Sequence, residues 1–297
     1  MPDTTIYLKN YQAPTFSINT VDLTVDLFDD HALVVNKMTL VRHHQGPLHL
    51  NGNELELVSI KVNDVTLDPF AYVLEPDGLI LEQCPDEMTL ELVTRILPQE
   101  NTQLSGLYRS NRLFCTQCEA EGFRRITYFM DRPYVLATYS TRISADKRQY
   151  PTLLSNGNLI ESGATEDGRH WALWQDPFKK PCYLFALVAG DLACVRDEFV
   201  TASGRRVDLR IYVEPGNEDK CAHAMTSLKK SMRWDEEVYG REYDLDIFMI
   251  VAVSDFNMGA MENKGLNIFN SKYILASPDT ATDQDFADIE GVVAHEY

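Results

Sequence analysis

The sequence predicts a mainly β protein with a smaller α+β part at its C-terminal end. Polar and apolar residues alternate with period two in several runs before residue 143, turn-forming residues separate these runs, and helical spacing appears only after residue 213. Period two is typical of strands that bury one face, whereas helices repeat every 3.6 residues. We therefore expect an antiparallel β-rich domain over residues 1–191 and a strand-plus-helix layer over residues 192–297.

The first part contains six runs that we predict to be strands. Residues 20–27 alternate most regularly, and turn signals such as Asn156-Gly157-Asn158 bound the runs. The remaining runs are 31–41, 55–62, 79–81, 90–97 and 135–143. The apolar run 183–189 ends at Gly190, where we expect the domain boundary.

The second part begins with a predicted hairpin over 199–213 that turns at Ser203-Gly204. An unbroken apolar run over 247–253 predicts a strand buried on both faces. The first predicted helix ends at Gly240, and its stripe consists of Met225, Leu228, Met232, Asp235 and Tyr239. The last predicted helix, 283–297, has a stripe formed by Phe286, Ile289 and Val293, with His295 on the opposite side.

The charge balance limits the classes of partner. The chain has 27 Lys and Arg against 45 Asp and Glu, which gives a formal net charge of −18. Nucleic acids and anionic membrane surfaces would be repelled, whereas ligands that carry an amine are favoured. A transmembrane helix needs about 18 consecutive apolar residues, and no apolar run approaches this length. The N-terminus lacks the basic and apolar regions of a secretory signal. We expect a cytoplasmic protein.

Cysteines and clustered histidines give weak signals. Cys115-x-x-Cys118 could be half of a zinc site or a redox pair, but no second pair follows, so six free, buried thiols are the favoured interpretation. His43, His44 and His49 have no carboxylate at ligand spacing, and we interpret them as part of a solvated loop.

Two short motifs carry stronger chemical signals. His295-Glu296 is the beginning of an H-E-x-x-H pattern, in which two His bind zinc and the Glu is a general base. Taken alone, this pair is weak evidence, and a surface histidine on a helix is the favoured interpretation. Residues 258–267 place two methionines and two glycines around Glu262, directly after the buried strand. By itself this segment is also compatible with a simple tight turn.

Together, these motifs resemble the zinc aminopeptidases. Gly259-Ala260-Met261-Glu262-Asn263 matches the G-A-M-E-N box of that family, and His295-Glu296 follows at the family's spacing. Gln117-Cys118-Glu119-Ala120, with Arg124-Arg125 and Asp131-Arg132-Pro133 after it, resembles the segment by which the family's first domain reaches the active site. The resemblance covers nearly the whole chain and favours the broad-specificity bacterial branch over the leukotriene hydrolase branch.

The resemblance implies a fold and a set of residue roles. It implies a β-saddle first domain followed by the beginning of a thermolysin-like catalytic domain. Residue 297 would then lie inside the zinc-binding helix of that domain. His295 would be a zinc ligand and Glu296 the general base, with the other ligands and an oxyanion-stabilising Tyr beyond residue 297. The residues assigned to substrate binding are Gln117, Glu119, Met258, Gly259, Ala260, Met261, Glu262 and Asn263.

Physical arguments agree with this assignment. An α-ammonium group that enters a cleft loses solvation, so Glu119 and Glu262 would favour a chain end over an internal peptide nitrogen. The Gly259-Ala260 backbone could bind an extended substrate as an added strand, and the flexible Met258 would line the first side-chain pocket. The expected partners are peptides with a free N-terminal amine, and the intact enzyme is expected to be a monomer with one Zn²⁺.

Alternative functions remain open from the sequence. The chain could be a non-catalytic β-rich binding module without metal. A zinc endopeptidase is disfavoured, because it has no use for two amine-binding carboxylates. Since one His cannot hold zinc, which needs three or four protein ligands, we expect these 297 residues alone to bind zinc weakly and to be inactive.

Overall fold

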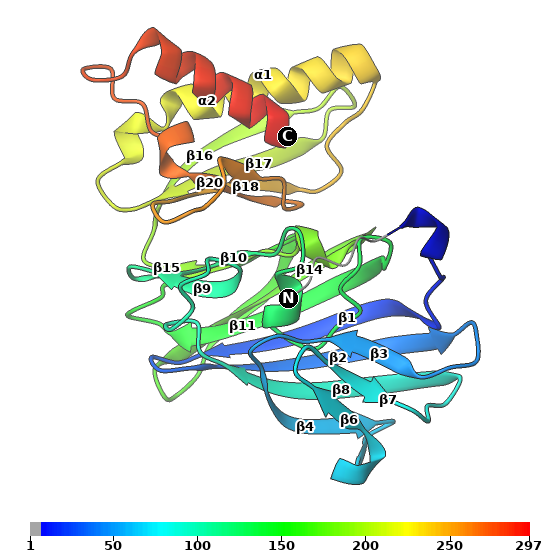
Figure 1. Cartoon of the computed structure of the whole chain (residues 1–297). Coiled ribbons are helices and arrows are strands. Elements are labelled where there is room, and N and C mark those ends of the chain that lie inside the picture. The colour runs from blue at the N-terminus through cyan, green and yellow to red at the C-terminus, as the bar shows by residue number, and fades with distance from the viewer. Residues whose placement is uncertain (1–6) are drawn as a thin grey trace.

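The computed structural model describes residues 7–297 as four β-sheets and two α-helices, with the C-terminal sheet and its helices stacked on the first three sheets (Figure 1). The largest sheet has eight strands in the order β13-β14-β11-β1-β2-β8-β4-β5. Its strands are β1 (Phe16–Leu27), β2 (Ala32–Arg42), β4 (Glu56–Val62), β5 (Val65–Thr66), β8 (Glu87–Ile96), β11 (Ala137–Asp146), β13 (Asn158–Ala164) and β14 (Arg169–Lys180).

Two smaller sheets complete the first part. One has the order β3-β7-β6 and the other β12-β15-β10-β9. Their strands are β3 (Leu48–Asn51), β6 (Val73–Glu75), β7 (Gly78–Leu81), β9 (Gly106–Ser110), β10 (Leu113–Gln117), β12 (Thr152–Ser155) and β15 (Leu187–Gly190). Short 3-10 helices occur in both parts of the chain. They are η1 (Leu8–Asn10), η2 (Pro69–Ala71), η3 (Phe123–Arg125), η4 (Cys182–Leu184), η5 (Glu218–Lys220) and η6 (Ser271–Tyr273).

The C-terminal part is a five-stranded sheet with two helices on one face (Figure 1). The strand order is β16-β17-β18-β20-β19, in which β17, β18 and β20 are parallel and the two edge strands are antiparallel to their neighbours. Its elements are β16 (Ala193–Val200), β17 (Arg206–Val213), α1 (Ala222–Tyr239), β18 (Ile247–Val253), β19 (Ala260–Met261), β20 (Leu266–Asn270) and α2 (Asp283–Glu296).

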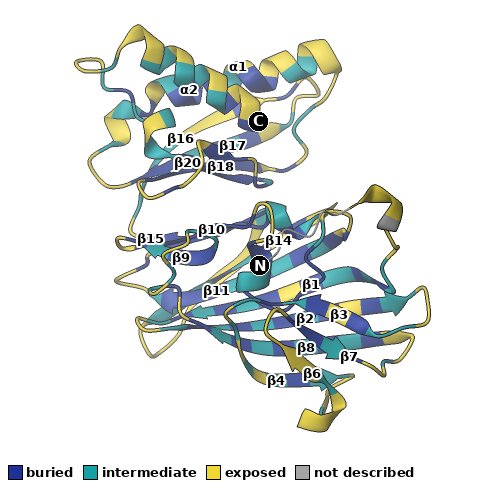
Figure 2. Ribbon diagram, in the orientation of Figure 1, coloured by how far each residue is buried: buried dark blue, intermediate teal, exposed yellow. Residues whose placement is uncertain are grey.

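Strand β18 separates the two hydrophobic cores of the molecule. Met249 and Val251 belong to the core shared with the first part, whereas Phe248 and Ile250 belong to the core under α1 and α2. Successive side chains of a strand point to opposite faces, which explains why every residue of 247–253 is apolar. Figure 2 shows β18 and β20 buried between the two layers.

Most of the predicted elements are confirmed. All six alternating runs of the first part overlap strands, the predicted hairpin is β16–β17, and 247–253 is β18. Helix α1 ends at Gly240 in the left-handed conformation (φ 62°), as predicted. The fold class, mainly β with an α+β C-terminal part, is therefore confirmed.

Four details of the prediction were wrong. The large sheet is not purely antiparallel, because β1 and β11 pair in parallel. His49 lies on strand β3 and not in a loop. Tyr239 is 64% exposed and does not belong to the apolar stripe of α1. Cys84 and Cys194 are only partly buried, although burial of all six cysteines was predicted.

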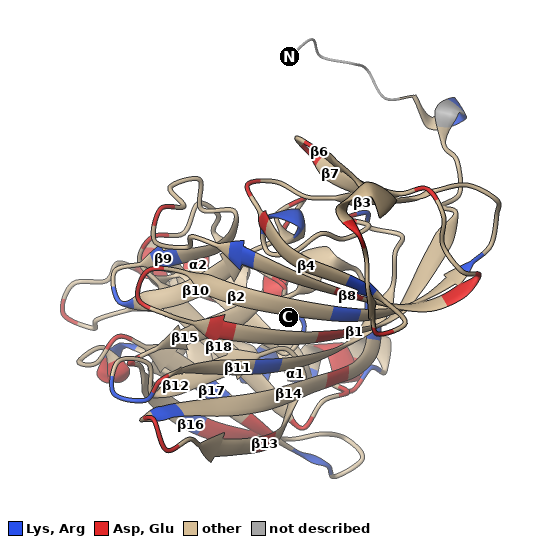
Figure 3. Cartoon of the chain, turned by 90° about the horizontal axis from the view of Figure 1, so that it is seen from below, with Lys and Arg blue, Asp and Glu red and all other residues tan. Residues whose placement is uncertain are grey.

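Acidic and basic residues are both dispersed along the strands and loops seen in Figure 3. Acidic residues outnumber basic ones in the sequence, which gives the net charge of −18. Among residues 7–297, neither helix is long and apolar enough to cross a bilayer.

Candidate active site

Glu119 lies on a tight loop that follows β10. The preceding residue, Cys118, is fully buried, whereas the Glu119 side chain is exposed. The amide of Gly122 donates a hydrogen bond to the carbonyl oxygen of Cys118 at 2.8 Å and closes the loop. A Cβ atom at Gly122 would lie 2.4 Å from the carbonyl oxygen of Gln117, so this close backbone approach requires glycine.

Asp131 fixes the far end of this loop. Its Oδ2 accepts hydrogen bonds from the backbone amide of Arg124 at 3.1 Å and from Arg124 Nε at 2.9 Å. Its Oδ1 accepts one from Cys182 Sγ at 3.1 Å. Because the Asp131 side chain is only 1% exposed, these donors replace water around a buried charge and hold the loop in one conformation.

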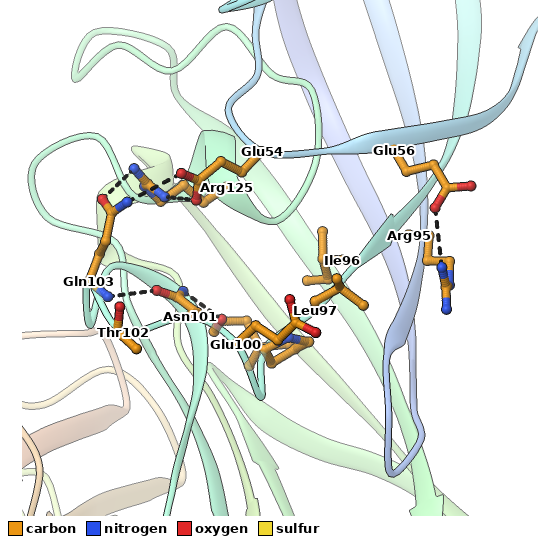
Figure 4. Close-up of a pocket in the computed structure, with 12 residues that line it drawn as sticks. Glu54, Glu56, Arg95, Ile96, Leu97, Glu100, Asn101, Thr102, Gln103 and Arg125 are labelled. Atoms are coloured by element: carbon orange, nitrogen blue, oxygen red, sulfur yellow. Dashed lines mark hydrogen bonds and ion pairs between the residues drawn. The ribbon is translucent and has the colours of Figure 1, made fainter.

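Arg125 supports the same loop from another side, at a polar hollow of about 440 Å³ (Figure 4). Its guanidinium donates to Glu54 Oε2 at 2.6 Å and to Gln103 Oε1 at 2.6 Å. Gln103 Nε2 donates in turn to Glu54 Oε1 at 3.2 Å. Since Arg125, Glu54 and Gln103 bind one another, we interpret them as a support for the loop and not as a ligand site.

Glu262 follows β19 in the hairpin that joins β19 to β20. Ala260 pairs with Phe269, and the amide of Asn270 donates to the carbonyl oxygen of Gly259 at 2.9 Å. Strand β19 is the last strand of its sheet. One side of its backbone therefore has no strand partner among residues 7–297, which is the geometry that an added extended chain requires.

The side chains of the G-A-M-E-N segment divide between surface and core. Met258 is 48% exposed and Glu262 is also exposed. Ala260 is buried, and Met261 and Asn263 are completely buried, with Met261 in the core shared with the first part. Contacts from Met261 or Asn263 to a ligand would therefore have to come from their backbone.

Helix α2 carries the third part of the site. Thr282 begins it with a capping box: Asp285 N donates to Thr282 Oγ1 at 3.2 Å, and Thr282 N donates to Asp285 Oδ2 at 2.8 Å. At the other end, His295 is exposed, whereas Glu296 is only 9% exposed. His295 also lines a hollow of about 480 Å³ between α1 and α2.

Glu119, Glu262 and Glu296 come from three segments that are distant in sequence but lie close enough to influence one another. Burial, as the largest cause, and the charges of Glu262 and Glu119 together raise the pKa of Glu296 to about 7, although the neighbouring His295 acts to lower it. Burial and then the charge of Glu262 also raise the pKa of Glu119. Ionised carboxylates that repel one another form a favourable site for a positively charged group.

Three buried polar side chains of this region have atoms without hydrogen-bond partners among the residues that the structure describes. They are the amide of Gln117, at both its nitrogen and its oxygen, the Oδ1 atom of Asn263 and the Oε2 atom of Glu296. A buried polar atom without a partner is costly. A bound ligand or water that reaches these atoms would therefore be stabilised.

The metal donors within the described chain are incomplete. No group of three or more His, Cys, Asp and Glu side chains in residues 7–297 is placed to hold a metal ion. His295 offers one imidazole, and a catalytic zinc site needs about three protein ligands. These residues therefore do not form a complete zinc site, and no reaction step through a metal follows from them.

The cysteines do not contribute reactive groups. All six are free, as predicted, and Cys115 and Cys118 are both fully buried. Burial raises the pKa of each of these two thiols, to about 12 for Cys115. Because the thiolate is the form that reacts and binds metal, the C-x-x-C pair is structural.

Two asparagines of this region were not predicted from the sequence. Asn267 on β20 donates to the carbonyl oxygen of Glu296 at 3.1 Å. Asn156, in a predicted turn of the first part, donates to the carbonyl oxygen of Lys264 at 2.9 Å. The only signal for Asn267 is a polar residue inside an apolar strand, and nothing local distinguishes Asn156 from an ordinary turn residue.

Similarity to known proteins is extensive. The profile of the Peptidase M1 N-terminal domain matches residues 20–184, and that of the Peptidase family M1 domain matches residues 223–297. Aminopeptidase N of Escherichia coli is 57% identical over 98% of this chain and 33% of its own length. Aminopeptidase N of Haemophilus influenzae is 53% identical over 98% of this chain and 34% of its own.

A solved structure agrees with these matches. Legionella pneumophila aminopeptidase A, in complex with aspartic acid, superposes with a TM-score of 0.94 at 39% identity, over 97% of this chain and 35% of that one. The chain thus spans about a third of the length of these relatives. The first profile alone covers more than half of the 297 residues, and together with the relatives it shows that the chain belongs to peptidase family M1.

Proposed function

We propose that this chain is the leading part of a zinc-dependent aminopeptidase that releases N-terminal residues from peptides with broad specificity. Residues 1–191 form the domain that contributes to the amine pocket, and residues 192–297 form the start of the peptidase domain. The carboxylate cluster of Glu119, Glu262 and Glu296 is the observation that carries the proposal.

The carboxylate cluster accounts for selectivity toward chain ends. A free α-ammonium group that leaves water needs compensating negative charge, which Glu119 and Glu262 provide from two sides. The amide of Gln117, two residues before Glu119, is buried and has hydrogen-bonding capacity to spare. An internal peptide nitrogen would leave both carboxylates unpaired, so it is rejected.

The edge strand accounts for tolerance of different residues. The backbone of Gly259, Ala260, Met261 and Asn263 binds the substrate's extended backbone, which is common to all residues. Met258 contacts the first side chain, and its flexible thioether adjusts to different shapes. The 48% exposure of Met258 supports this role, because its side chain is available for contact.

Glu296 acts as the proton carrier and His295 as a metal ligand. Zinc, when bound, polarises the scissile carbonyl group and lowers the pKa of its water. Glu296 takes up a proton at its buried carboxylate and returns it to the leaving amine. The unpartnered Oε2 atom supports this role, because it is able to accept a proton.

Hydrolysis of amino-acyl anilides by the full-length protein with zinc tests the proposal. Glu262→Ala and Glu296→Ala should each abolish most activity, whereas Glu290→Ala, at a half-exposed position of α2 where the carboxylate pairs with Lys230, should not. N-acetylated substrates should not be cleaved. Absence of hydrolysis by the wild-type protein, or full activity of either site variant, would refute it.

A non-catalytic binding module is the second candidate for these 297 residues alone. The incomplete set of metal donors favours it for the isolated chain. Under our proposal the isolated chain binds zinc weakly and is inactive, and it acquires activity only within the longer protein. Metal analysis of the isolated chain after dialysis tests this expectation, because stoichiometric zinc would contradict it.

Three further expectations belong to the proposal. The intact enzyme is cytoplasmic and monomeric, and it binds one Zn²⁺. Its partners are peptides with a free amine and not nucleic acids, in keeping with a net charge of −18. Cleavage of internal bonds in an N-acetylated peptide would favour an endopeptidase instead.

A further inference from the structure

The predicted turn Asn156-Gly157-Asn158 does more than connect β12 to β13. Asn156 is 3% exposed, and all of its side-chain hydrogen-bonding groups are used. Its Nδ2 donates to the carbonyl oxygens of Leu184 and Lys264, both at 2.9 Å, and its Oδ1 accepts from the amide of Ala186 at 2.7 Å. One side chain thus joins the first part to the hairpin of Glu262.

The same short segment receives a second bond from that hairpin. Asn263 Nδ2 donates to the carbonyl oxygen of Phe185 at 3.4 Å. Asn263 and Lys264 are the two residues that directly follow Glu262. Both are therefore tied to residues 184–186, directly in one case and through Asn156 in the other.

Residues 184–186 also contact the loop of Glu119. The rings of Phe185 and Phe123 meet edge to face with centroids 5.3 Å apart, and both are fully buried. Phe123 belongs to η3, which ends the Glu119 loop. Close-packed interiors transmit displacements between neighbours, so the position of residues 184–186 influences both carboxylates.

Close packing of the two turns leaves little freedom for the hairpin. Gly265 has φ +77°, and a Cβ atom there would lie 3.3 Å from the amide nitrogen of Gly157 and 2.9 Å from Leu245 Cδ1. Only glycine fits both this conformation and this approach. The hairpin therefore rests directly on the turn that carries Asn156.

We propose that Asn156 is a positioning residue that sets the separation between Glu262 and Glu119, and so determines the affinity for the N-terminal ammonium group. This inference rests on the proposed aminopeptidase function. Loss of the Asn156 amide releases the carbonyl group of Lys264 and allows the Glu262 segment to move away from Glu119. An ammonium group would then no longer contact both carboxylates at once.

Amide hydrogen exchange in the 297-residue chain tests the positioning role without requiring activity. Asn156→Ala should accelerate exchange of the amides of residues 261–265 at least tenfold, while amides of β8 stay unchanged. Asn158→Ala is the matched control, because Asn158 lies in the same turn but exchanges bonds of 3.1 and 3.2 Å with Asp246. It should leave residues 261–265 unchanged.

Kinetics of the full-length protein test the consequence for affinity. Asn156→Ala should raise KM for an alanyl anilide roughly tenfold and change kcat less than about twofold, because the ammonium group is bound equally in the ground and transition states. Asn158→Ala should leave KM unchanged. A purely structural role would instead lower the amount of active enzyme and leave KM unaltered.

The outcomes separate this inference from the proposed function. A wild-type protein without aminopeptidase activity refutes the function, while the exchange experiment still decides the positioning role. Unchanged exchange in Asn156→Ala, equal acceleration in Asn158→Ala, or faster exchange with unchanged KM overturns the inference. If Asn156→Ala does not fold, Asn156→Ser, which retains one donor, should give an intermediate increase in exchange and KM.

Discussion

The side-chain amide of Asn267 donates a hydrogen bond to the carbonyl oxygen of Glu296 at 3.1 Å and so joins β20 to the last turn of α2. Both residues are buried. Carbonyl groups in the last turn of a helix have no partner within the helix. This bond satisfies one of them and fixes Glu296 relative to the strand that continues from the Glu262 hairpin.

Replacement of Asn267 by Leu should lower the free energy of unfolding of the 297-residue chain by about 1–3 kcal/mol, because a buried carbonyl group loses its partner. Urea denaturation measures the change. Asn257→Ala is the control, since Asn257 is exposed and its amide lies 3.4 Å from the carbonyl oxygen of Leu104. It should cost less than about 0.5 kcal/mol, and equal losses would contradict the role given to Asn267.

Replacement of Gly122 by Ala should destabilise the chain by about 1–3 kcal/mol, because the new methyl group would overlap the carbonyl oxygen of Gln117. The same substitution at Gly291 is the control. Gly291 lies in α2, and a Cβ atom there meets no atom within 4 Å. Gly291→Ala should therefore stabilise by about 0.5–1 kcal/mol. Thermal unfolding of both variants should show opposite shifts in Tm.

Local patterns account for the part of the fold that the sequence predicted. Residues 20–27 alternate because one face of their strand is buried, and residues 247–253 are all apolar because both faces are. In each case the burial of a position determines whether its residue is polar or apolar, so the pattern can be read from the sequence alone. Gly240 is another local signal, because it ends α1 in the left-handed conformation, which glycine adopts more easily than other residues. The contiguous motifs at 117–120, 259–263 and 295–296 were assigned through their resemblance to a family, and the residue roles given to them stay predictions.

Long-range pairing accounts for what the sequence did not predict. The parallel pairing of β1 with β11 joins segments more than a hundred residues apart, and alternation is the same for parallel and antiparallel neighbours. The aromatic Tyr239 fits a helical period but lies at the exposed end of α1. The turn at Asn156 has ordinary turn composition, and its role depends on contacts with Lys264, which no local pattern encodes.

Substitution of Asp131 by Asn should lower the free energy of unfolding by about 2–4 kcal/mol, because it removes the charge that faces the partly buried guanidinium of Arg124. Glu121→Gln is the control. Glu121 pairs with the same guanidinium at 3.0 Å but is 59% exposed, so its loss should cost less than about 1 kcal/mol. Urea denaturation of both variants measures the difference, and a larger loss for Glu121→Gln would contradict this account of the loop.

The stability of the metal-free 297-residue chain should fall as pH rises from about 4.5 to about 7, because the pKa of Glu296 is raised from 4.5 to about 7 by burial and by the charges of Glu262 and Glu119. The folded state then binds more protons than the unfolded state across this window. The contribution is complete below about pH 4.5 and lost above about pH 7, with an upper bound of about 3 kcal/mol.

Glu296→Gln isolates this contribution, because it keeps the shape of the side chain and cannot ionise. In EDTA, its free energy of unfolding relative to the wild-type chain should increase between pH 4.5 and pH 7 and stay constant at higher pH. Glu290→Gln removes the same charge from a half-exposed position of α2, and it should show little of this change. If the Glu296→Gln difference did not depend on pH, the buried carboxylate would not be perturbed, and its suitability as a proton carrier near neutral pH would lose its physical basis.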